Sequence, residues 1–284
     1  MKKSDKIFIC IVFTLVVVGL SLVTVGACCG GLTMAKTFIT ENRIPGISFA
    51  VNKVQTSDNN ISTAAKDSTT SASADAQDLV ISGNMGDVTI EAGNCDEICV
   101  DKCTAQCQTV DNRVIITAND TDDMKIIVPK NKSLNEVSIS LAAADIEIDG
   151  LNCNSLKLSC ASGDVDIDTL SVSGTAEVSM DAGDMDISDA VMEAADITMG
   201  MGDFEFEGKV DGNLDLSCSM GNAKLTFKDS KDNHNVTATS VLGNVCIDSK
   251  RESGINNSIS TSSDSDSCYN IVCDCGNVDI SFTK

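Results

Sequence analysis

The chain of 284 residues carries 42 acidic and 20 basic side chains, a net charge of −22, with 14 Cys, one His, one Tyr and no Trp. This charge excludes nucleic acid as a partner, because phosphate backbones are bound by clustered cationic side chains. Acidic pairs are numerous enough to imitate a glycosidase site, but the aromatic platforms of sugar sites are scarce in a chain with 3% aromatic residues. We therefore predict a protein that is not an enzyme and carries no cofactor.

The first predicted element is a membrane anchor. Lys2, Lys3 and Lys6 make residues 1–6 a basic tail, and residues 7–33 are uncharged and mostly apolar. At ~1.5 Å per residue, a helix of this length crosses the ~30 Å hydrocarbon core of a bilayer. The positive-inside rule places the basic tail in the cytoplasm. The sequence thus predicts a single-pass protein of the cell membrane whose C-terminal domain is extracytoplasmic.

A signal sequence is the alternative interpretation of the same segment. Residues 25–28 read Val-Gly-Ala-Cys and resemble a lipoprotein box, in which Cys28 would receive lipid after cleavage. The apolar run is longer than the core of a usual signal peptide, which favours the uncleaved anchor. Both alternatives tether the rest of the chain to a membrane.

Residues 34–77 are predicted to link the anchor to a folded body. Residues 56–76 are dominated by Ser, Thr, Ala and Asp without apolar periodicity, which predicts a flexible polar tether. The preceding residues 37–54 contain scattered apolar side chains. These lie either on the membrane surface or against the first coil of the body.

From residue 78 to the end at 284, the chain repeats a short motif. A Gly is followed by Asp or Asn, with apolar residues at the second and fourth positions after the Gly. Gly permits the backbone conformation of a tight turn, and the Asp or Asn can hydrogen-bond the local backbone. The turns recur every 19 or 20 residues in the regular part, which marks a repeat protein. The turn glycines are Gly86, Gly163, Gly183, Gly202, Gly221, Gly243 and Gly276, with Ala144 at the equivalent position before Gly163.

The apolar positions define strands. They fall five and three residues before each turn and two and four residues after it, as in Leu158, Cys160, Val165 and Ile167. This alternation describes two short strands with one buried face, and segments such as residues 170–172 close the coil. One coil cannot bury its own apolar face, so coils must stack. The sequence predicts an all-β fold, a parallel β-helix with about 19–20 residues per coil, behind one N-terminal transmembrane helix.

Both ends of this body depart from the regular pattern. Residues 97–129 contain strands without the glycine turn, and we expect them to form irregular first coils between Gly86 and Ala144. The chain ends at residues 278–284, directly after a strand and with no obvious capping element. An uncovered last coil would offer unpaired backbone groups, so end-to-end homo-association is one prediction.

The strand at residues 124–130, the segment 137–148 and the glycine repeats together resemble the bacterial "putative adhesin" family of β-strand-repeat domains of unknown function. The resemblance covers roughly residues 78–284. It implies a right-handed β-helix behind one membrane anchor in the cell envelope, with no catalytic motif. The many Cys and the wider spacing after Gly243 depart from the family pattern.

Acidic side chains fall at outward positions of successive repeats. Adjacent carboxylates repel, so such rows either face water and salt or hold cations. Ca²⁺ takes oxygen ligands and would suit the first row, although the nonapeptide of calcium-binding β-rolls is absent and a solvated acidic face is the simpler interpretation. The row directly after the turn comprises Asp145, Asp164, Asp184 and Asp203, and the row two residues later comprises Glu147, Asp166, Asp186 and Glu205.

Cysteine is unusually frequent for an exported chain. Cys160, Cys218 and Cys273 take inward positions that hold Met or Leu in other repeats, so small buried thiols explain them. A separate cluster recurs every four residues and could hold Zn²⁺ or an iron–sulfur centre on a helix, form a local disulfide such as Cys103 to Cys107, or be scattered along a strand. This cluster comprises Cys95, Cys99, Cys103 and Cys107.

Together these patterns predict a non-catalytic, membrane-anchored surface β-helix. The single His234 lies in a polar segment with no evident partner. The acidic face predicts an adhesin-like or envelope-sensing module that binds an extracellular protein, a cell-wall component or a cationic peptide. Two alternatives stay open: a self-associating structural solenoid, and a lipoprotein whose acidic face is stabilised by calcium.

Overall fold

The computed structural model describes residues 70–71, 76–101, 106–118 and 123–283. The basic tail, the predicted membrane anchor, Cys28, Cys103 and most of the linker lie outside these residues. In the part of the chain that is described, no helix is long and apolar enough to span a bilayer. The transmembrane helix therefore stays a prediction.

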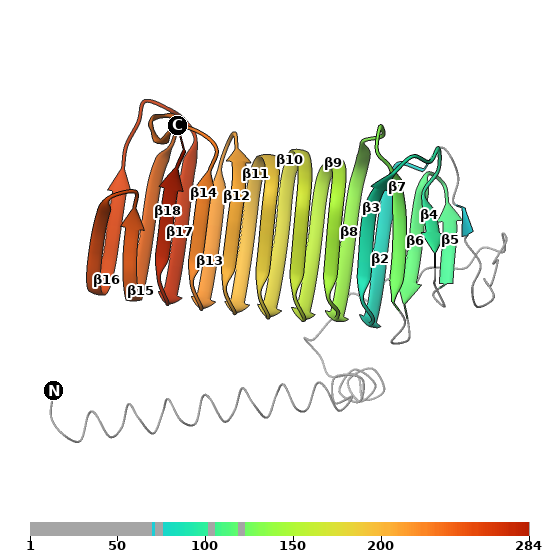
Figure 1. Cartoon of the computed structure of the whole chain (residues 1–284), viewed down its shortest axis with the longest axis horizontal. Helices are drawn as coiled ribbons and strands as arrows, with labels where there is room; N and C mark the ends of the chain where they lie inside the picture. The colour runs from blue at the N-terminus through green and yellow to red at the C-terminus, as the bar shows by residue number, and fades with distance from the viewer. Residues whose placement is uncertain (1–69, 72–75, 102–105, 119–122, 284) are drawn as a thin grey trace, which may run out of the picture. The chain divides into compact units, whose positions relative to one another are not determined.

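The described residues wind into a β-solenoid (Figure 1). Eighteen strands join in one sheet, and a short 3-10 turn, Lys231–Asn233, lies between two of them. Ile146 pairs in parallel with Val165, and Val165 with Met185, so equivalent residues are 19 and 20 positions apart. The predicted all-β class and parallel stacking are confirmed. The three longest strands, each nearly a whole coil, are β9 (Ile146–Ser162), β10 (Val165–Ala182) and β11 (Met185–Met201).

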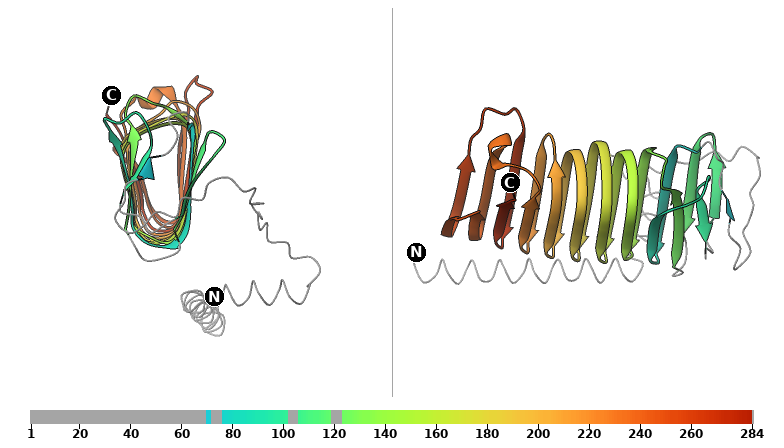
Figure 2. Two further views of the ribbon diagram at one scale, coloured as in Figure 1. Left: turned by 90° about the vertical axis from the view of Figure 1, so that its right-hand side faces the viewer. Right: turned by 45° about the horizontal axis from the view of Figure 1, so that its top comes forward.

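Each long strand bends while its pairing continues. The bend after the first segment is made by residues with left-handed φ, 58° at Thr169 and 48° at Asp189. A second irregularity in register follows Val172. Between these points, residues 170–172 pair with residues 151–153, so the predicted third segment of the coil is present. These bends give the solenoid its flattened cross-section (Figure 2).

The interior is filled by the side chains that the repeat predicts. All four inward positions of every repeat, from Ile139 to Ile280, are buried. Aromatic rings gather in the C-terminal half, where the ring of Phe227 lies 5.5 Å from that of Phe206 and 4.7 Å from that of Tyr269. Each coil therefore buries its apolar face against the coils on either side, which is how a solenoid gains stability.

At the N-terminal end, the order of coils in space differs from their order in the chain. The coil of β2 and β3 lies between the coil of β6 and β7 and the coil that begins with β8. Val88 pairs directly with Ile146. The expectation that residues 97–129 form irregular first coils is confirmed, and their coil lies outside that of β2 and β3 because both edges of β2 and β3 accept a parallel strand. The strands are β2 (Asp78–Met85), β3 (Val88–Gly93), β6 (Arg113–Ala118), β7 (Met124–Pro129) and β8 (Leu134–Ala143).

Antiparallel strands cover the outer edge of this end. β5 pairs with β6, while β4 pairs with β7 on one side and with β1 on the other. Covering an edge removes a row of unpaired backbone groups. The strands are β1 (Thr70–Ser71), β4 (Cys99–Asp101) and β5 (Gln106–Val110).

The C-terminal end is rearranged in a similar way. After β13 and β14 the chain passes to β15, turns back as the antiparallel β16, and then inserts β17 and β18 between β13–β14 and β15. The last strand of the chain is thus paired on both edges, and β16 is the outermost strand (Figure 1). The expectation of an uncapped end at residues 278–284 is wrong; homo-association itself stays a prediction. The strands are β12 (Phe204–Val210), β13 (Leu214–Met220), β14 (Ala223–Phe227), β15 (Asn235–Ile247), β16 (Lys250–Thr261), β17 (Cys268–Cys275) and β18 (Val278–Phe282).

Candidate binding surfaces

Glycine turns align along one corner of the solenoid. Gly183 and Gly202 have a φ of +130°, a conformation that residues with a Cβ rarely adopt. Neighbouring turns also pack closely, since a Cβ on Gly202 would lie 1.9 Å from the carbonyl oxygen of Gly183. Gly86 has a φ of 115°. The same close approach to the preceding turn recurs at Gly163, Gly183, Gly221, Gly276 and Gly243.

Directly after each turn, an Asp or Asn joins its coil to the next, and we call this row the Asx ladder. An Oδ1 atom accepts the backbone N–H of the equivalent residue, at 2.9 Å from Asp145 to Asp164 and 2.8 Å from Asp184 to Asp203. The Asn members also donate their side-chain amides to the preceding member. The ladder was not predicted from the sequence. The position after the glycine holds only Asp or Asn in these repeats, and that restriction to residues with a side-chain acceptor oxygen could have indicated it. In spatial order the members are Asp87, Asp145, Asp164, Asp184, Asp203, Asn222, Asn277 and Asn244.

The Asx ladder gives the predicted calcium row a structural role, because Asp145, Asp164 and Asp184 each commit one carboxylate oxygen to a backbone N–H. Among the described residues, no group of three or more His, Cys, Asp or Glu is arranged to hold a metal ion. Burial and the neighbouring Cys99 raise the pKa of Cys95, so this thiol resists the ionisation that metal binding requires. Calcium binding by the row stays a prediction.

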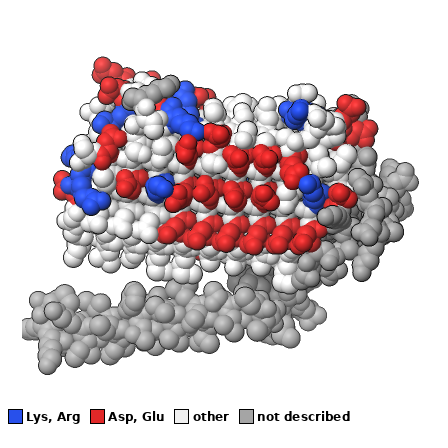
Figure 3. Space-filling view, in the orientation of Figure 1, with Lys and Arg blue, Asp and Glu red and all other residues white. Residues whose placement is uncertain are grey.

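Three rows of carboxylates run along one side of the solenoid (Figure 3). We call these rows the acidic face. The middle row meets a cation at one end, where Lys224 forms an ion pair with Glu205 at 3.0 Å. Lys125 lies in line with the middle row at its other end and pairs with Glu91 of the adjoining row at 2.8 Å. The rows comprise Asp145, Asp164, Asp184 and Asp203; Glu147, Asp166, Asp186 and Glu205; and Glu91, Asp149, Asp168 and Glu207, with Ser188 between the last two.

Asp186 lies at the centre of the acidic face. It borders a depression of ≈230 Å³ that Asp166, Glu205 and Lys224 also line. Partial burial, followed by the charges of Glu205 and Asp166, raises the pKa of Asp186. The charged form of this side chain is therefore less stable in the fold than in water. The lysines of the acidic face do not neutralise its carboxylates, so a bound cation would stabilise them.

Replacing Asp186 with Asn is expected to stabilise the protein at neutral pH. A carboxyl whose pKa is raised by folding opposes folding when charged, and this penalty disappears as the pH falls through the raised value. Like charges on adjacent strands cost ~0.2–1 kcal/mol, so D186N should raise the free energy of unfolding by about that amount in low salt. Urea unfolding at pH 7 measures the gain, which should shrink at ~1 M salt, where the Debye length is ~3 Å. An equal gain in high salt would contradict repulsion as the cause.

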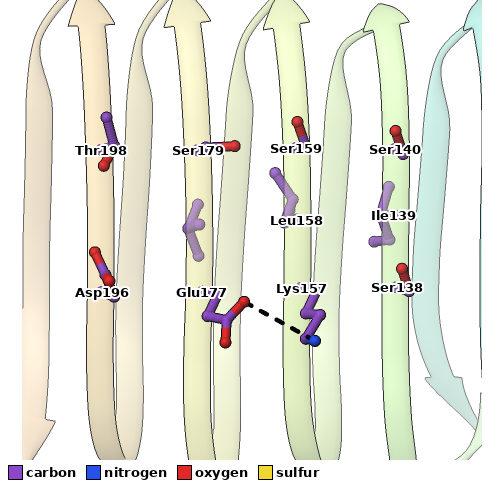
Figure 4. Close-up of a pocket in the computed structure, with 11 residues that line it drawn as sticks. Ser138, Ile139, Ser140, Lys157, Leu158, Ser159, Glu177, Ser179, Asp196 and Thr198 are labelled. Atoms are coloured by element: carbon purple, nitrogen blue, oxygen red, sulfur yellow. Dashed lines mark ion pairs between the residues drawn. The ribbon is translucent and has the colours of Figure 1, made fainter. Parts of the chain in front are cut away.

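A second surface lies on strands β8 to β11 and carries hydroxyl groups instead of an acidic array. Ser140, Ser159, Ser179 and Thr198 stand side by side over buried apolar residues and border a shallow groove of ≈340 Å³ (Figure 4). The row beside them includes Lys157 and is of mixed charge, with one ion pair of 4.0 Å to a glutamate. This groove offers hydrogen bonds but little net charge.

His234 is not solitary, contrary to the sequence-based expectation. Its side chain is 2% exposed, and its ring stacks on that of Tyr269 at 4.2 Å. Its Nδ1 lies 2.8 Å from Oγ of Ser267, and its Nε2 lies 3.3 Å from Oδ2 of Asp229 and 3.2 Å from the hydroxyl of Tyr269. We call these four residues the buried polar junction. Asp229 lies five residues before His234, but Ser267 and Tyr269 lie 33 and 35 residues after it, so the segment around His234 showed only part of the junction.

The hydrogen bonds of the junction determine where its protons lie. The Tyr269 hydroxyl donates to the carbonyl of Val210, and the Ser267 hydroxyl donates to the carbonyl of Gly212, each at 2.5 Å. Both hydroxyl protons are therefore committed, and both ring nitrogens of His234 face acceptors only. Nδ1 of His234 therefore faces the Ser267 oxygen, and Nε2 faces the oxygens of Asp229 and Tyr269.

Asp229 is ionised within this junction. Burial alone would raise its pKa, but hydrogen bonds from the Ser230 N–H, the Asn233 amide and His234 outweigh burial and lower the pKa. Lys209 adds a positive charge 3.9 Å away. With the Ser267 proton held by a backbone carbonyl, Asp229, His234 and Ser267 act here as a structural connection between strands β12, β15 and β17.

The cysteines of the repeats divide into inward and outward positions. Cys160, Cys218 and Cys273 are buried, as the repeat predicts, and Cys218 lies beside Cys273 on paired strands. The hydrogen bond that Cys273 donates to Cys218, together with burial, raises the pKa of Cys273. Cys275 instead lies on the surface. The inward thiols act as small apolar side chains of the core.

The family described as Toastrack DUF4097 matches residues 109–281. A solved structure from Clostridium sporogenes described as a "putative cell adhesion protein" is 12% identical, with a TM-score of 0.35, over 77% of this chain and 99% of that chain. A "putative adhesin" from Bacteroides fragilis is 14% identical, with a TM-score of 0.38, over 78% of this chain and 99% of that chain. No curated protein matches the sequence.

Proposed function

The chain belongs to the Toastrack DUF4097 family, and from this premise we propose that it is a non-catalytic β-solenoid that binds cationic ligands of the cell envelope through its acidic face. The family match confirms the resemblance carried by the glycine repeats. An adhesin-like or envelope-sensing role fits a body whose described surface is dominated by an ordered charge array. The right-handed winding implied by the resemblance belongs to this proposal.

The observation that carries the proposal is the arrangement of charge on a stiff scaffold. Rows of carboxylates repeat at the ~4.8 Å spacing of strands, and each row is held by continuous backbone pairing. Fixed charges of one sign attract oppositely charged ligands and speed their association. The raised pKa of Asp186 supports the proposal, because a bound cation would offset the partial burial and the repulsion by Glu205 and Asp166 that cause it.

The position of the body in the cell is part of the proposal. Residues 7–33 would hold it at the membrane as an uncleaved span, or Cys28 would hold it through lipid after cleavage. The Ser- and Thr-rich residues 56–76 would keep the acidic face away from the bilayer. The solenoid would then meet ligands outside the cytoplasm, where extracellular proteins, cell-wall components and cationic peptides are its candidate partners.

Binding of heptalysine to the full-length chain tests the acidic face. Four substitutions in the middle row, E147Q, D166N, D186N and E205Q, remove charge without removing bulk. Each exposed ion pair is worth ~0.2–1 kcal/mol, so together they should weaken binding about tenfold or more and flatten its dependence on salt. Fluorescence anisotropy of labelled heptalysine in a salt series measures both effects.

The matched control neutralises four exposed carboxylates away from the middle row: E177Q, D196N, D215N and D266N. It produces the same change in net charge, so it should weaken binding by less than threefold. Equal losses in the two variants would mean that net charge, and not the acidic face, attracts the peptide, and the proposal would then fail.

A further inference from the structure

An exposed row of mainly apolar side chains runs along the solenoid immediately before the glycine turns. In-register pairing joins Ala182 to Met201, Met201 to Met220, and Met220 to Cys275. The exposed fraction rises from 38% at Met201 to 53% at Leu242 and 72% at Ile255. We call this row the apolar ridge. In spatial order it comprises Met85, Ala143, Ser162, Ala182, Met201, Met220, Cys275, Leu242 and Ile255.

Carboxylates border the apolar ridge on both sides. Asp184 and Asp203 of the Asx ladder follow Ala182 and Met201 across the glycine turn, and Asp181 and Asp274 precede the ridge residues on their own strands. These four side chains are exposed. The surface therefore combines a contiguous apolar strip with a negative border, and exposed apolar strips on soluble domains mark sites of interaction.

We infer that the apolar ridge binds a cationic amphipathic polypeptide segment, whose apolar face covers the ridge while its Lys and Arg side chains reach the bordering carboxylates. This inference rests on the proposed function of the acidic face and names the ligand. From Ala182 to Ile255 the ridge has six rungs, which at ~4.8 Å each extend about 24 Å, the length of about 16 helical residues. Met side chains adapt to varied partners and suit such contacts.

Charge decides between this occupant and the others that an apolar strip could accept. A second copy of the chain would bring its own Asp184 and Asp203 against the same carboxylates, and like charges at close range disfavour that pairing. An anionic lipid surface would meet the same repulsion. A cationic amphipathic segment satisfies the apolar ridge and its border together.

Two synthetic peptides test the inference with the full-length chain. One is an 18-residue helix of Leu and Lys with a single apolar face, and the other is a permutation of the same residues without that face. Fluorescence anisotropy should show the amphipathic peptide binding at least tenfold more tightly than the permutation. Equal binding of the two peptides would overturn the inference and leave the acidic face as the proposed site.

Paired variants locate the binding. M220T/L242T removes two ridge side chains, and the control V110T/V191T removes two apolar side chains of similar exposure, 48% and 49%, elsewhere. The ridge variant should weaken the amphipathic peptide at least tenfold and leave the permuted peptide unchanged, while the control changes neither by more than twofold. Unchanged binding in M220T/L242T would overturn the inference.

Neutralising the carboxylates that border the apolar ridge tests whether they contribute to binding of the amphipathic peptide. D184N/D203N keeps the Asx ladder intact, because Asn222, Asn277 and Asn244 already serve in it. The variant should weaken the amphipathic peptide about fivefold and reduce its salt dependence; binding that keeps its full salt dependence would overturn the role of the border. Failure of both peptides and of heptalysine to bind would instead remove the proposed function and this inference with it.

Discussion

Replacing Gly202 with Ala is expected to disrupt the centre of the solenoid. The φ of +130° at this position strains any residue with a Cβ, at a cost of ~1–3 kcal/mol. The added Cβ would also lie 1.9 Å from the carbonyl oxygen of Gly183, so the two coils would have to separate. The combined loss of stability should exceed ~4 kcal/mol, a value that few substitutions reach. Urea unfolding followed by circular dichroism measures it.

Gly254 provides the control for this prediction. It has a similar φ of +136°, but a Cβ there would meet only Asn257 Oδ1, at 3.7 Å. G254A should therefore show the backbone strain alone, ~1–3 kcal/mol, without the contact between coils. If G202A and G254A destabilised the protein equally, the close packing of the turns would not be what requires glycine.

Replacing His234 with Ala should destabilise the rearranged C-terminal strands, β15 to β18. The substitution removes the side-chain hydrogen bond between His234 and Asp229 and the ring that stacks on Tyr269. Leaving a buried polar group without its hydrogen-bond partner costs ~1–3 kcal/mol. Because the buried polar junction ties β12, β15 and β17 together, amide hydrogen exchange should show β15 to β18 losing protection while β9 to β11 keep theirs.

Two further variants, D232A and D229N, test whether the loss of stability comes from the buried polar junction or from any change in the loop that contains His234. Asp232 lies exposed in the same turn, and D232A should change stability by less than ~0.5 kcal/mol. Asp229 has a lowered pKa, so its stabilising effect is complete above the ordinary Asp value of ~3.9 and is lost as the pH falls through the lower folded value. Wild-type stability should therefore fall below about pH 4 more steeply than that of D229N. Equal acid slopes would show that Asp229 is not ionised in the junction.

Much of the fold follows from the pattern of apolar residues. Positions such as Leu158, Val165 and Ile167 repeat at the coil length, and every position predicted to face inward is buried. The glycines and the following Asp or Asn were also visible as turns. These features are local, because a period of two residues within a strand and a turn of two residues are set by neighbours in the chain.

The order of the coils could not be predicted in the same way. Every coil presents similar apolar positions and the same parallel edge, so the coil at Gly86 can stack on the one at Ala144 or on the one formed by residues 113–129, and it does both. Closing a longer loop adds little entropy cost, about 0.6 kcal/mol per doubling of length. Local pattern therefore does not determine which coil lies beside which.

The proposed functional surfaces likewise include features that local sequence predicts and features that depend on the order of the coils. The coil, its inward and outward positions and the acidic rows were predictable, because each of these follows from residue spacing within one or two repeats. The position of β17 and β18 between β13–β14 and β15 was visible only in the folded chain. This order completes the Asx ladder, links Met220 through Cys275 to Leu242 in the apolar ridge and brings His234 and Tyr269 together. Those contacts connect residues far apart in the chain, and packing of whole coils is what selects them.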